Sequence, residues 1–215
     1  MPGLFDTQTF VTYCVAASAL VISPGPGQAL VITRSVERGP LGGILTSLGL
    51  EVGTLVHTLA AGLGLSAILA TSATAFLLVT YAGAAYLIVL GVFALRSSFR
   101  PPLPESALAP DSGGNWALVL HAAVTGVLNP KVAVFFLAFL PQFVHPERGS
   151  VLAQFLVLGL ALSVIALSWD SVVATLIGRA RGRFVSSPRF VAWRERVTGG
   201  VLLGLGLRLA FSERR

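Results

Sequence analysis

Apolar residues lie in long runs along this chain, and short polar stretches separate the runs. A bilayer has a hydrocarbon core about 30 Å thick, so a helix needs roughly 20 mainly apolar residues to cross it. The pattern therefore predicts an all-α integral membrane protein with six transmembrane helices. The six runs are Thr7 to Thr33, Leu41 to Leu63, Thr74 to Leu95, Trp116 to Leu140, Val151 to Ile177 and Val191 to Phe211.

The composition agrees with this interpretation. Of the 215 residues, 54% are hydrophobic and 11% are charged, whereas soluble domains contain about 25% charged residues. A small soluble domain must still cover its surface with polar groups, so the lipid bilayer is the expected solvent for most of this surface. Since no hydrophilic stretch is long enough for a second domain, residues 1–215 are predicted to form a single membrane domain.

Basic residues determine the expected orientation. The net charge of +6 arises between the apolar runs, which is typical of topology determinants and not of a nucleic-acid-binding face. The first, third and fifth loops contain most of the arginines. The loops on the other side of the membrane contain only Arg148, and the C-terminal tail adds Arg214 and Arg215. By the positive-inside rule the basic loops are cytoplasmic and both termini lie outside. These loops contain Arg34, Arg38, Arg96, Arg100, Arg179, Arg181, Arg183, Arg189, Arg194 and Arg196.

The side chains present exclude several kinds of chemistry. One cysteine, Cys14, rules out an intramolecular disulfide, a dithiol redox pair and a thiolate metal cluster. The sequence shows neither metal-ligand spacing nor a nucleophile with its base. We therefore expect no enzyme, no cofactor and no metal. The first run is expected to be retained, because Asp6 precedes it and no basic residue occurs before Arg34.

Matching segments indicate an internal repeat. Glu37-Arg38-Gly39 recurs as Glu147-Arg148-Gly149, and Leu48-Gly49-Leu50 recurs at the same offset as Leu158-Gly159-Leu160. A duplicated unit of three helices inserts with opposite orientation the second time, because three is an odd number. The result is an inverted-topology 3+3 repeat, an architecture typical of transporters.

Two further features concern how the helices are connected and packed. Residues 98–114 contain four prolines and are predicted to form a linker between halves of about 1–97 and 115–215. The small-residue patterns Gly49 to Gly53 and Gly200 to Gly204 indicate close helix packing. The sequence leaves open whether they pack helices within one chain or in a homodimer.

Prolines and glycines interrupt the first and fourth runs at related positions. Each proline removes a backbone donor and blocks a hydrogen bond to the carbonyl four residues earlier. In lipid the freed carbonyls must be buried in protein or line a cavity, and the amide end of the restarting helix suits a carboxylate. Simple kinks are the alternative, but two related breaks favour a binding site. Its candidate residues are Ser23, Pro24, Gly25, Pro26 and Gln28, then Asn129, Pro130 and Lys131.

Charged side chains inside the runs are candidates for ion coupling. Lys131 lies midway along its run, which favours a functional or pairing role over snorkelling to the interface. Glu51 and Asp170 are either proton carriers or members of a static ion pair, perhaps formed with Lys131. His57 follows Glu51 by six positions and so lies on another helix face. It is either a proton relay or a buried histidine held by a backbone carbonyl.

Together these motifs resemble the lysine-exporter (LysE/RhtB-type) family along essentially the whole chain. The resemblance implies a bacterial inner-membrane exporter of amino acids or close derivatives, driven by proton exchange. In that family an acidic or amide residue often follows Ser-Pro-Gly-Pro directly, whereas here Gly27 precedes Gln28. The matching segments are Ser23-Pro24-Gly25-Pro26, Tyr81-Ala82-Gly83-Ala84-Ala85-Tyr86-Leu87, Asn129-Pro130-Lys131 and the aromatic run from Phe135 to Phe143.

The resulting hypothesis is a secondary transporter of a small zwitterionic amino acid. The substrate would bind near the membrane midplane, with its carboxylate on Lys131 and on the amides that follow Pro24 and Pro130. Glu51 or Asp170 would bind its ammonium or exchange a proton. The alternative is a non-transporting scaffold or a passive channel-like protein, because broken helices also line pores.

Overall fold

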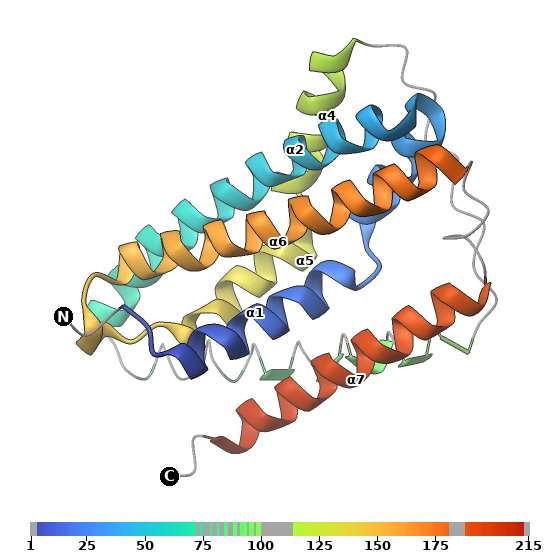
Figure 1. The fold of residues 1–215 in the computed structure, drawn as a ribbon. Coiled ribbons are helices and arrows are strands. Elements are labelled where there is room, and N and C mark those ends of the chain that lie inside the picture. The colour runs from blue at the N-terminus through green and yellow to red at the C-terminus, as the bar shows by residue number, and fades with distance from the viewer. Residues whose placement is uncertain are drawn as a thin grey trace.

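The computed structural model describes residues 4–71, 114–180 and 188–212, with scattered positions between 74 and 99. These residues are helical and include no strand, so the all-α prediction is confirmed for them. Figure 1 shows the elements, which are α1 (Thr7–Ile22), α2 (Pro26–Thr71), α4 (Asn115–Val127), α5 (Pro130–Val134), the π-helical turn η1 (Phe135–Phe139), the 3₁₀ turns η2 (Leu140–Phe143) and η3 (Pro146–Arg148), α6 (Val151–Ala180) and α7 (Pro188–Ser212).

Some of these helices are long and apolar enough to cross a bilayer. Within the described part of the chain, Pro26–Gly64 and Val151–Arg179 each meet this test alone. Asn115–Val127 and Pro130–Phe143 meet it together, as one span bent by 46°. The described positions of the predicted helix at 74–95 are helical, whereas the linker at 98–114 lies largely outside the described residues. Six spans in an inverted repeat therefore remain a prediction.

The first two helices have different boundaries from those predicted. The sequence pattern indicated one helix from Thr7 to Thr33, but α1 ends at Ile22 and α2 begins at Pro26. Helical structure then continues through the polar stretch that was expected to end the first helix. It is interrupted at Gly39, whose φ of 72° and ψ of −170° are not helical. Charged residues do not end a helix, whereas a change of backbone dihedrals does, so α2 is two helices joined at this kink.

The predicted breaks in the first and fourth helices are both present. The chain leaves helical structure at Ser23 and restarts at Pro26, and it leaves again at Leu128 and restarts at Pro130. The glycines of the repeated Glu-Arg-Gly segment, Gly39 and Gly149, are also the glycines with positive φ among the described residues. Each precedes a long helical stretch, so the sequence match coincides with a similar backbone turn at both places.

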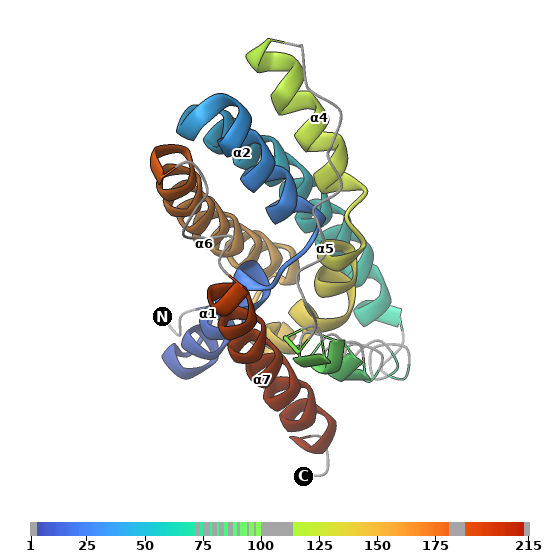
Figure 2. The ribbon, with the colours of Figure 1, turned by 90° about the vertical axis from the view of Figure 1, so that its right-hand side faces the viewer.

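The long helices form the centre of the molecule. The second part of α2 and α6 lie side by side over most of their length, α4 packs on α2, and α1 packs on α6 (Figures 1 and 2). Tyr13 of α1 is fully buried, and its hydroxyl donates a hydrogen bond of 2.7 Å to the Leu158 carbonyl of α6. Its ring contacts Phe135 and Phe143, which belong to the aromatic cluster around η1. These contacts attach α1 to the core.

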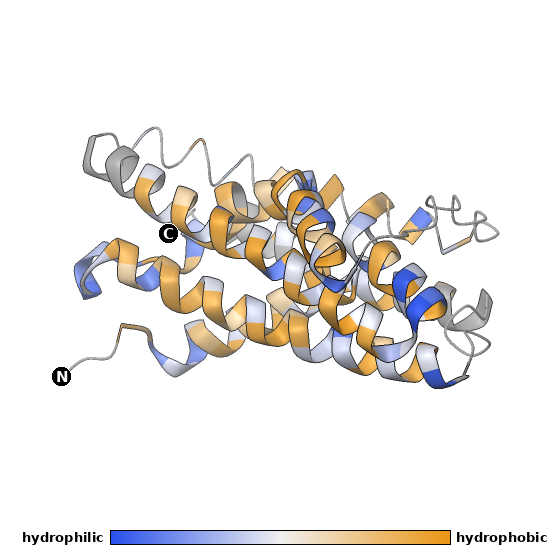
Figure 3. Cartoon of the chain, turned by 90° about the horizontal axis from the view of Figure 1, so that it is seen from above, coloured by the Kyte–Doolittle hydropathy of each residue, from blue (hydrophilic) through white to orange (hydrophobic). Residues whose placement is uncertain are grey.

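The outward faces of the helices are apolar. Figure 3 shows apolar positions along the helices, with hydrophilic positions gathered mainly toward their ends. A contiguous apolar surface of this extent is unusual on a soluble monomer, so the structure agrees with a lipid environment. Large exposed apolar side chains recur at helical spacing on α2 and α6, at Leu48, Val52, Leu55, Leu59, Leu63, Leu156, Leu160 and Val164.

Polar contacts hold the start of α1 against the turn before α6. Asp6 caps α1 by accepting a hydrogen bond of 2.7 Å from the Thr9 amide. This bond and a second one from the Thr9 hydroxyl lower the pKa of the Asp6 carboxyl. Arg148 lies 3.4 Å from the same carboxylate. The ion pair is partly exposed and lies outside the cavity described below.

Glycines let α2 and α4 approach closely. A Cβ atom at Gly53 would lie 2.4 Å from a backbone carbon of Gly126, and one at Gly49 would lie 2.3 Å from the Val119 carbonyl oxygen. The pattern at Gly49 and Gly53 therefore serves packing within the chain. Gly200 and Gly204 of α7 have no described atom within 4 Å of such a Cβ position.

Replacing Gly53 by alanine should lower the free energy of unfolding by about 1–3 kcal/mol, because the added methyl meets backbone that cannot move aside. Thermal unfolding in detergent micelles measures the effect. Gly64→Ala in the same helix is the control, since nothing lies within 4 Å of its Cβ position. Equal stability of the two variants would show that α2 and α4 are not in backbone contact.

Candidate functional site

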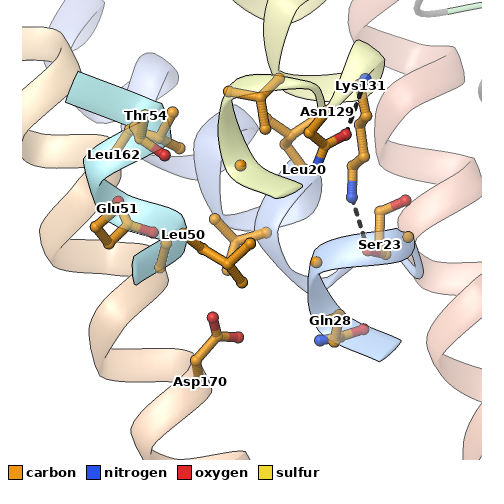
Figure 4. A pocket seen from close by; sticks show the side chains of 16 residues that line it. Leu20, Ser23, Gln28, Leu50, Glu51, Thr54, Asn129, Lys131, Leu162 and Asp170 are labelled. Carbon is orange, nitrogen blue, oxygen red and sulfur yellow. Dashed lines mark hydrogen bonds between the residues drawn. The ribbon is translucent and has the colours of Figure 1, made fainter. Parts of the chain in front are cut away.

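The two helix breaks meet in one cavity, shown in Figure 4. The cavity has a volume of about 80 Å³ for water-sized molecules. This is room for several waters or a small solute. Its walls come from the end of α1, the start and middle of α2, the α4–α5 break and α6. The lining residues are Leu20, Val21, Ser23, Gly25, Gly27, Gln28, Leu50, Glu51, Thr54, Gly126, Asn129, Lys131, Val132, Leu162, Ala166 and Asp170.

The first break is shaped by its prolines and glycines. Pro26 occupies the first position of α2, where its missing amide hydrogen costs nothing because that amide would have no helical partner. A Cβ at Gly25 would lie 3.3 Å from Lys131 Cδ, and one at Gly27 would lie 3.3 Å from Leu50 Cδ1. The two glycines therefore keep this side of the cavity open.

The second break is organised by Asn129. This buried residue caps α5, and its side-chain oxygen accepts a hydrogen bond of 3.1 Å from the Lys131 amide. The chain therefore satisfies that amide internally. Gly27, in the first turn of α2, lines the same cavity, where the helix N-terminus has partial positive charge.

Lys131 connects the two breaks. Its ammonium donates a hydrogen bond of 2.7 Å to the Ser23 carbonyl at the end of α1 (Figure 4). The last carbonyls of a helix have no helical donor and have partial negative charge, so a cation is stabilised there. The side chain is directed into the cavity. The functional or pairing role of Lys131 stays a prediction.

The two predicted carboxylates line the same cavity. Asp170 of α6 is 7% exposed, and its Oδ2 accepts a hydrogen bond of 3.0 Å from the fully buried Ser47 hydroxyl of α2. Glu51 lies on α2 one helical turn after Ser47. Its Oε2 is buried and has no hydrogen-bond partner among the described residues.

Charge is separated across the cavity. In Figure 4, Lys131 and Ser23 lie on one side and Glu51 and Asp170 on the other. Apolar side chains, including Leu50 and Leu162, complete the lining. A cation on one wall and carboxylates opposite it match the charges of a zwitterion, and the apolar lining lowers the local dielectric constant, which strengthens each electrostatic interaction.

The structure brings together most of the predicted site residues. Ser23, Gly25, Gln28, Asn129, Lys131, Glu51 and Asp170 line the cavity. Pro24, Pro26 and Pro130 form the breaks without lining it. His57 is outside the lining and stacks on Phe136, with ring centroids 6.2 Å apart. Its Nε2 is buried with no hydrogen-bond partner in the described part of the chain.

Sequence reasoning missed the hydroxyl groups around the carboxylates. Thr54 lines the cavity and Ser47 binds Asp170. Both share the helix face of Glu51, since they lie three positions after it and four before it. That spacing was a usable signal. The described residues contain no group of three or more His, Cys, Asp or Glu side chains arranged to hold a metal ion.

Residues 18–213 match the family model described as LysE type translocator. The chain is 31% identical over 211 residues to an uncharacterized membrane protein of Vibrio cholerae, and the alignment covers 97% of this chain and 99% of that protein. It is also 31% identical over 198 residues to a homoserine/homoserine lactone efflux protein of Salmonella typhimurium. This alignment covers 92% of this chain and 94% of that protein. No solved structure matches the chain significantly.

Replacing Asn129 by alanine should lower the free energy of unfolding by about 0.5–2 kcal/mol, because it removes the side-chain cap of α5. Thermal unfolding in detergent measures this change. Asn115→Ala is the matched control, since Asn115 is exposed at the start of α4. A loss of stability in both variants alike would argue against the capping role.

Proposed function

The chain belongs to the family of LysE type translocators, and on this premise we propose that it exports small amino acids or close analogues by proton antiport. The observation that supports the proposal most directly is the cavity at the junction of the two broken helices, with Lys131 opposite Glu51 and Asp170. The similarity to a homoserine/homoserine lactone efflux protein supports the same class of substrate.

The substrate carboxylate would bind on the Lys131 side. The Lys131 ammonium, which donates a hydrogen bond to the Ser23 carbonyl, supplies a full positive charge at this side of the cavity. The start of α2 at Gly27 adds the partial positive charge of a helix N-terminus. Asn129 already occupies the Lys131 amide, so the amides of the second break contribute less than the sequence pattern indicated.

The opposite wall would bind the ammonium and exchange protons. Glu51 and Asp170 are the carboxylates available for both tasks. Carboxylates inside a membrane protein commonly mark proton relays. His57 lies on the same helix as Glu51 and is proposed as a relay beyond the cavity.

The proposal includes six spans in an inverted repeat within a bacterial inner membrane, with both termini outside. Repeat-related breaks at Ser23–Gly25 and Leu128–Asn129 support the duplication, as do the matching turns at Gly39 and Gly149. The arginine distribution supports the orientation.

The deciding experiment is efflux from proteoliposomes that are loaded with a panel of radiolabelled amino acids, with and without an imposed proton gradient. Gradient-stimulated loss of one or a few amino acids is expected. Flux that ignores the gradient would indicate a passive channel. No movement of any amino acid through folded protein would indicate a scaffold or a different substrate class.

Lys131→Ala should reduce gradient-driven efflux about tenfold or more with unchanged expression, because a hydrogen bond to a charged group contributes about 1.5–3 kcal/mol. Pro24→Ala should also reduce efflux by restoring a donor at the break. Arg148→Ala removes a cation that lies outside the cavity and should leave efflux unchanged. Flux equal to wild type in folded Lys131→Ala protein would refute the assignment of the carboxylate site.

A further inference from the structure

The two cavity carboxylates differ in how their hydrogen-bonding capacity is used. Asp170 accepts from Ser47 across the α2–α6 interface, and both side chains are buried. Removing this bond would leave buried polar groups unsatisfied. Asp170 therefore has a structural task, namely to connect the two longest helices at the cavity.

Glu51 has an unused acceptor. Its Oε2 is buried without a hydrogen-bond partner in the described part of the chain, and so is the Ser163 hydroxyl of α6. Ser163 is a polar neighbour of the Glu51 carboxylate and directly follows the lining residue Leu162. Buried polar atoms are nearly always paired with protein, water or ligand. The Ser163 hydroxyl can supply one donor to the Glu51 carboxylate, but an ionised carboxylate has about four acceptor sites, so capacity is left on it for a donor from outside the chain.

A protonated amine fits this place. An ammonium group offers three donors, enough for Glu51 Oε2 and Ser163 Oγ together, and it neutralises the carboxylate. A hydroxyl offers a single donor and no charge. Glu51 lies across the cavity from Lys131 (Figure 4), so a zwitterion bound between them would have its carboxylate toward a cation and its ammonium toward a carboxylate.

We propose that Glu51, assisted by Ser163, is the ammonium subsite and determines specificity, so that only substrates with a free ammonium group are exported. The inference rests on the proposed export function and refines it. Asp170 is then a positioning residue that holds α6 against α2. Analogues in which the amine is replaced by a hydroxyl or blocked by an acyl group are poor substrates.

The test compares pairs of probes that differ only at the amine. Alanine is paired with lactate, and homoserine with 2,4-dihydroxybutyrate, in the proteoliposome assay. Wild-type protein should prefer the amine of a pair by about tenfold or more, because it gains a charge-assisted hydrogen bond. Glu51→Gln should remove most of this preference by slowing efflux of the amino acid and not of the hydroxy acid.

Two controls separate recognition from stability. Asp170→Asn should slow both members of a pair equally and leave their ratio unchanged. Glu147→Gln alters an exposed carboxylate outside the cavity and should leave rates and ratio unchanged. If Glu51→Gln does not fold, Ser163→Ala takes its place with Ser168→Ala as control, since Ser168 bonds only its own helix and is exposed. The Ser163 variant should lose preference several-fold.

The outcomes distinguish this inference from the function on which it depends. If wild-type protein moves no amino acid, both are overturned. If wild-type protein exports amino acids and Glu51→Gln keeps the wild-type ratio, only the ammonium subsite is overturned. A change of ratio in Asp170→Asn instead would assign the subsite to Asp170 and overturn the inference.

Discussion

The absence of water in the bilayer core is the constraint on which this structure depends. Backbone groups freed by a proline there must find partners in the protein or face a polar cavity. The chain interrupts helices at Ser23–Gly25 and Leu128–Asn129, and the two interruptions share one cavity. The hydrogen bond from Lys131 to the Ser23 carbonyl connects them. It places a cation on a helix end that has partial negative charge. The bond therefore lowers the free-energy cost of interrupting both helices.

Close packing of α2 determines what surrounds that cavity. Gly53 and Gly126 bring the α2 and α4 backbones into contact just before the second break. On the other flank of α2, Ser47 binds Asp170 of α6. Both contacts belong to one helix, so α2 positions the second break and the acidic wall relative to each other. Charges that would be unstable in lipid are thereby buried opposite one another, which is the usual way in which membrane proteins tolerate them.

Several features could be read from the sequence because they depend on local chemistry. Prolines predicted both breaks, with adjacent glycines at the first and an adjacent asparagine at the second. Charges within apolar runs predicted Lys131, Glu51 and Asp170 as residues that face the interior. The end of the first run is less exact, because polarity at Arg34 predicts a boundary at about Thr33 whereas helical structure continues to Gly39. Hydropathy reports the solvent of a segment, whereas helix ends depend on backbone dihedrals. The spacing of four positions before Glu51 places Ser47 on the same helix face, but only the packing of α6 against α2 shows that its partner is Asp170.

The sequence by itself determined a helical membrane protein, the two breaks and the family to which the chain belongs. The tertiary structure decided which polar residues share a cavity and which of them are already paired. Helical periodicity reveals the face on which a side chain lies, but it does not reveal which helix packs against that face. Ser23, Glu51, Lys131 and Asp170 come from four separate stretches of the chain, and only the packing of α1, α2, α5 and α6 places them around one cavity.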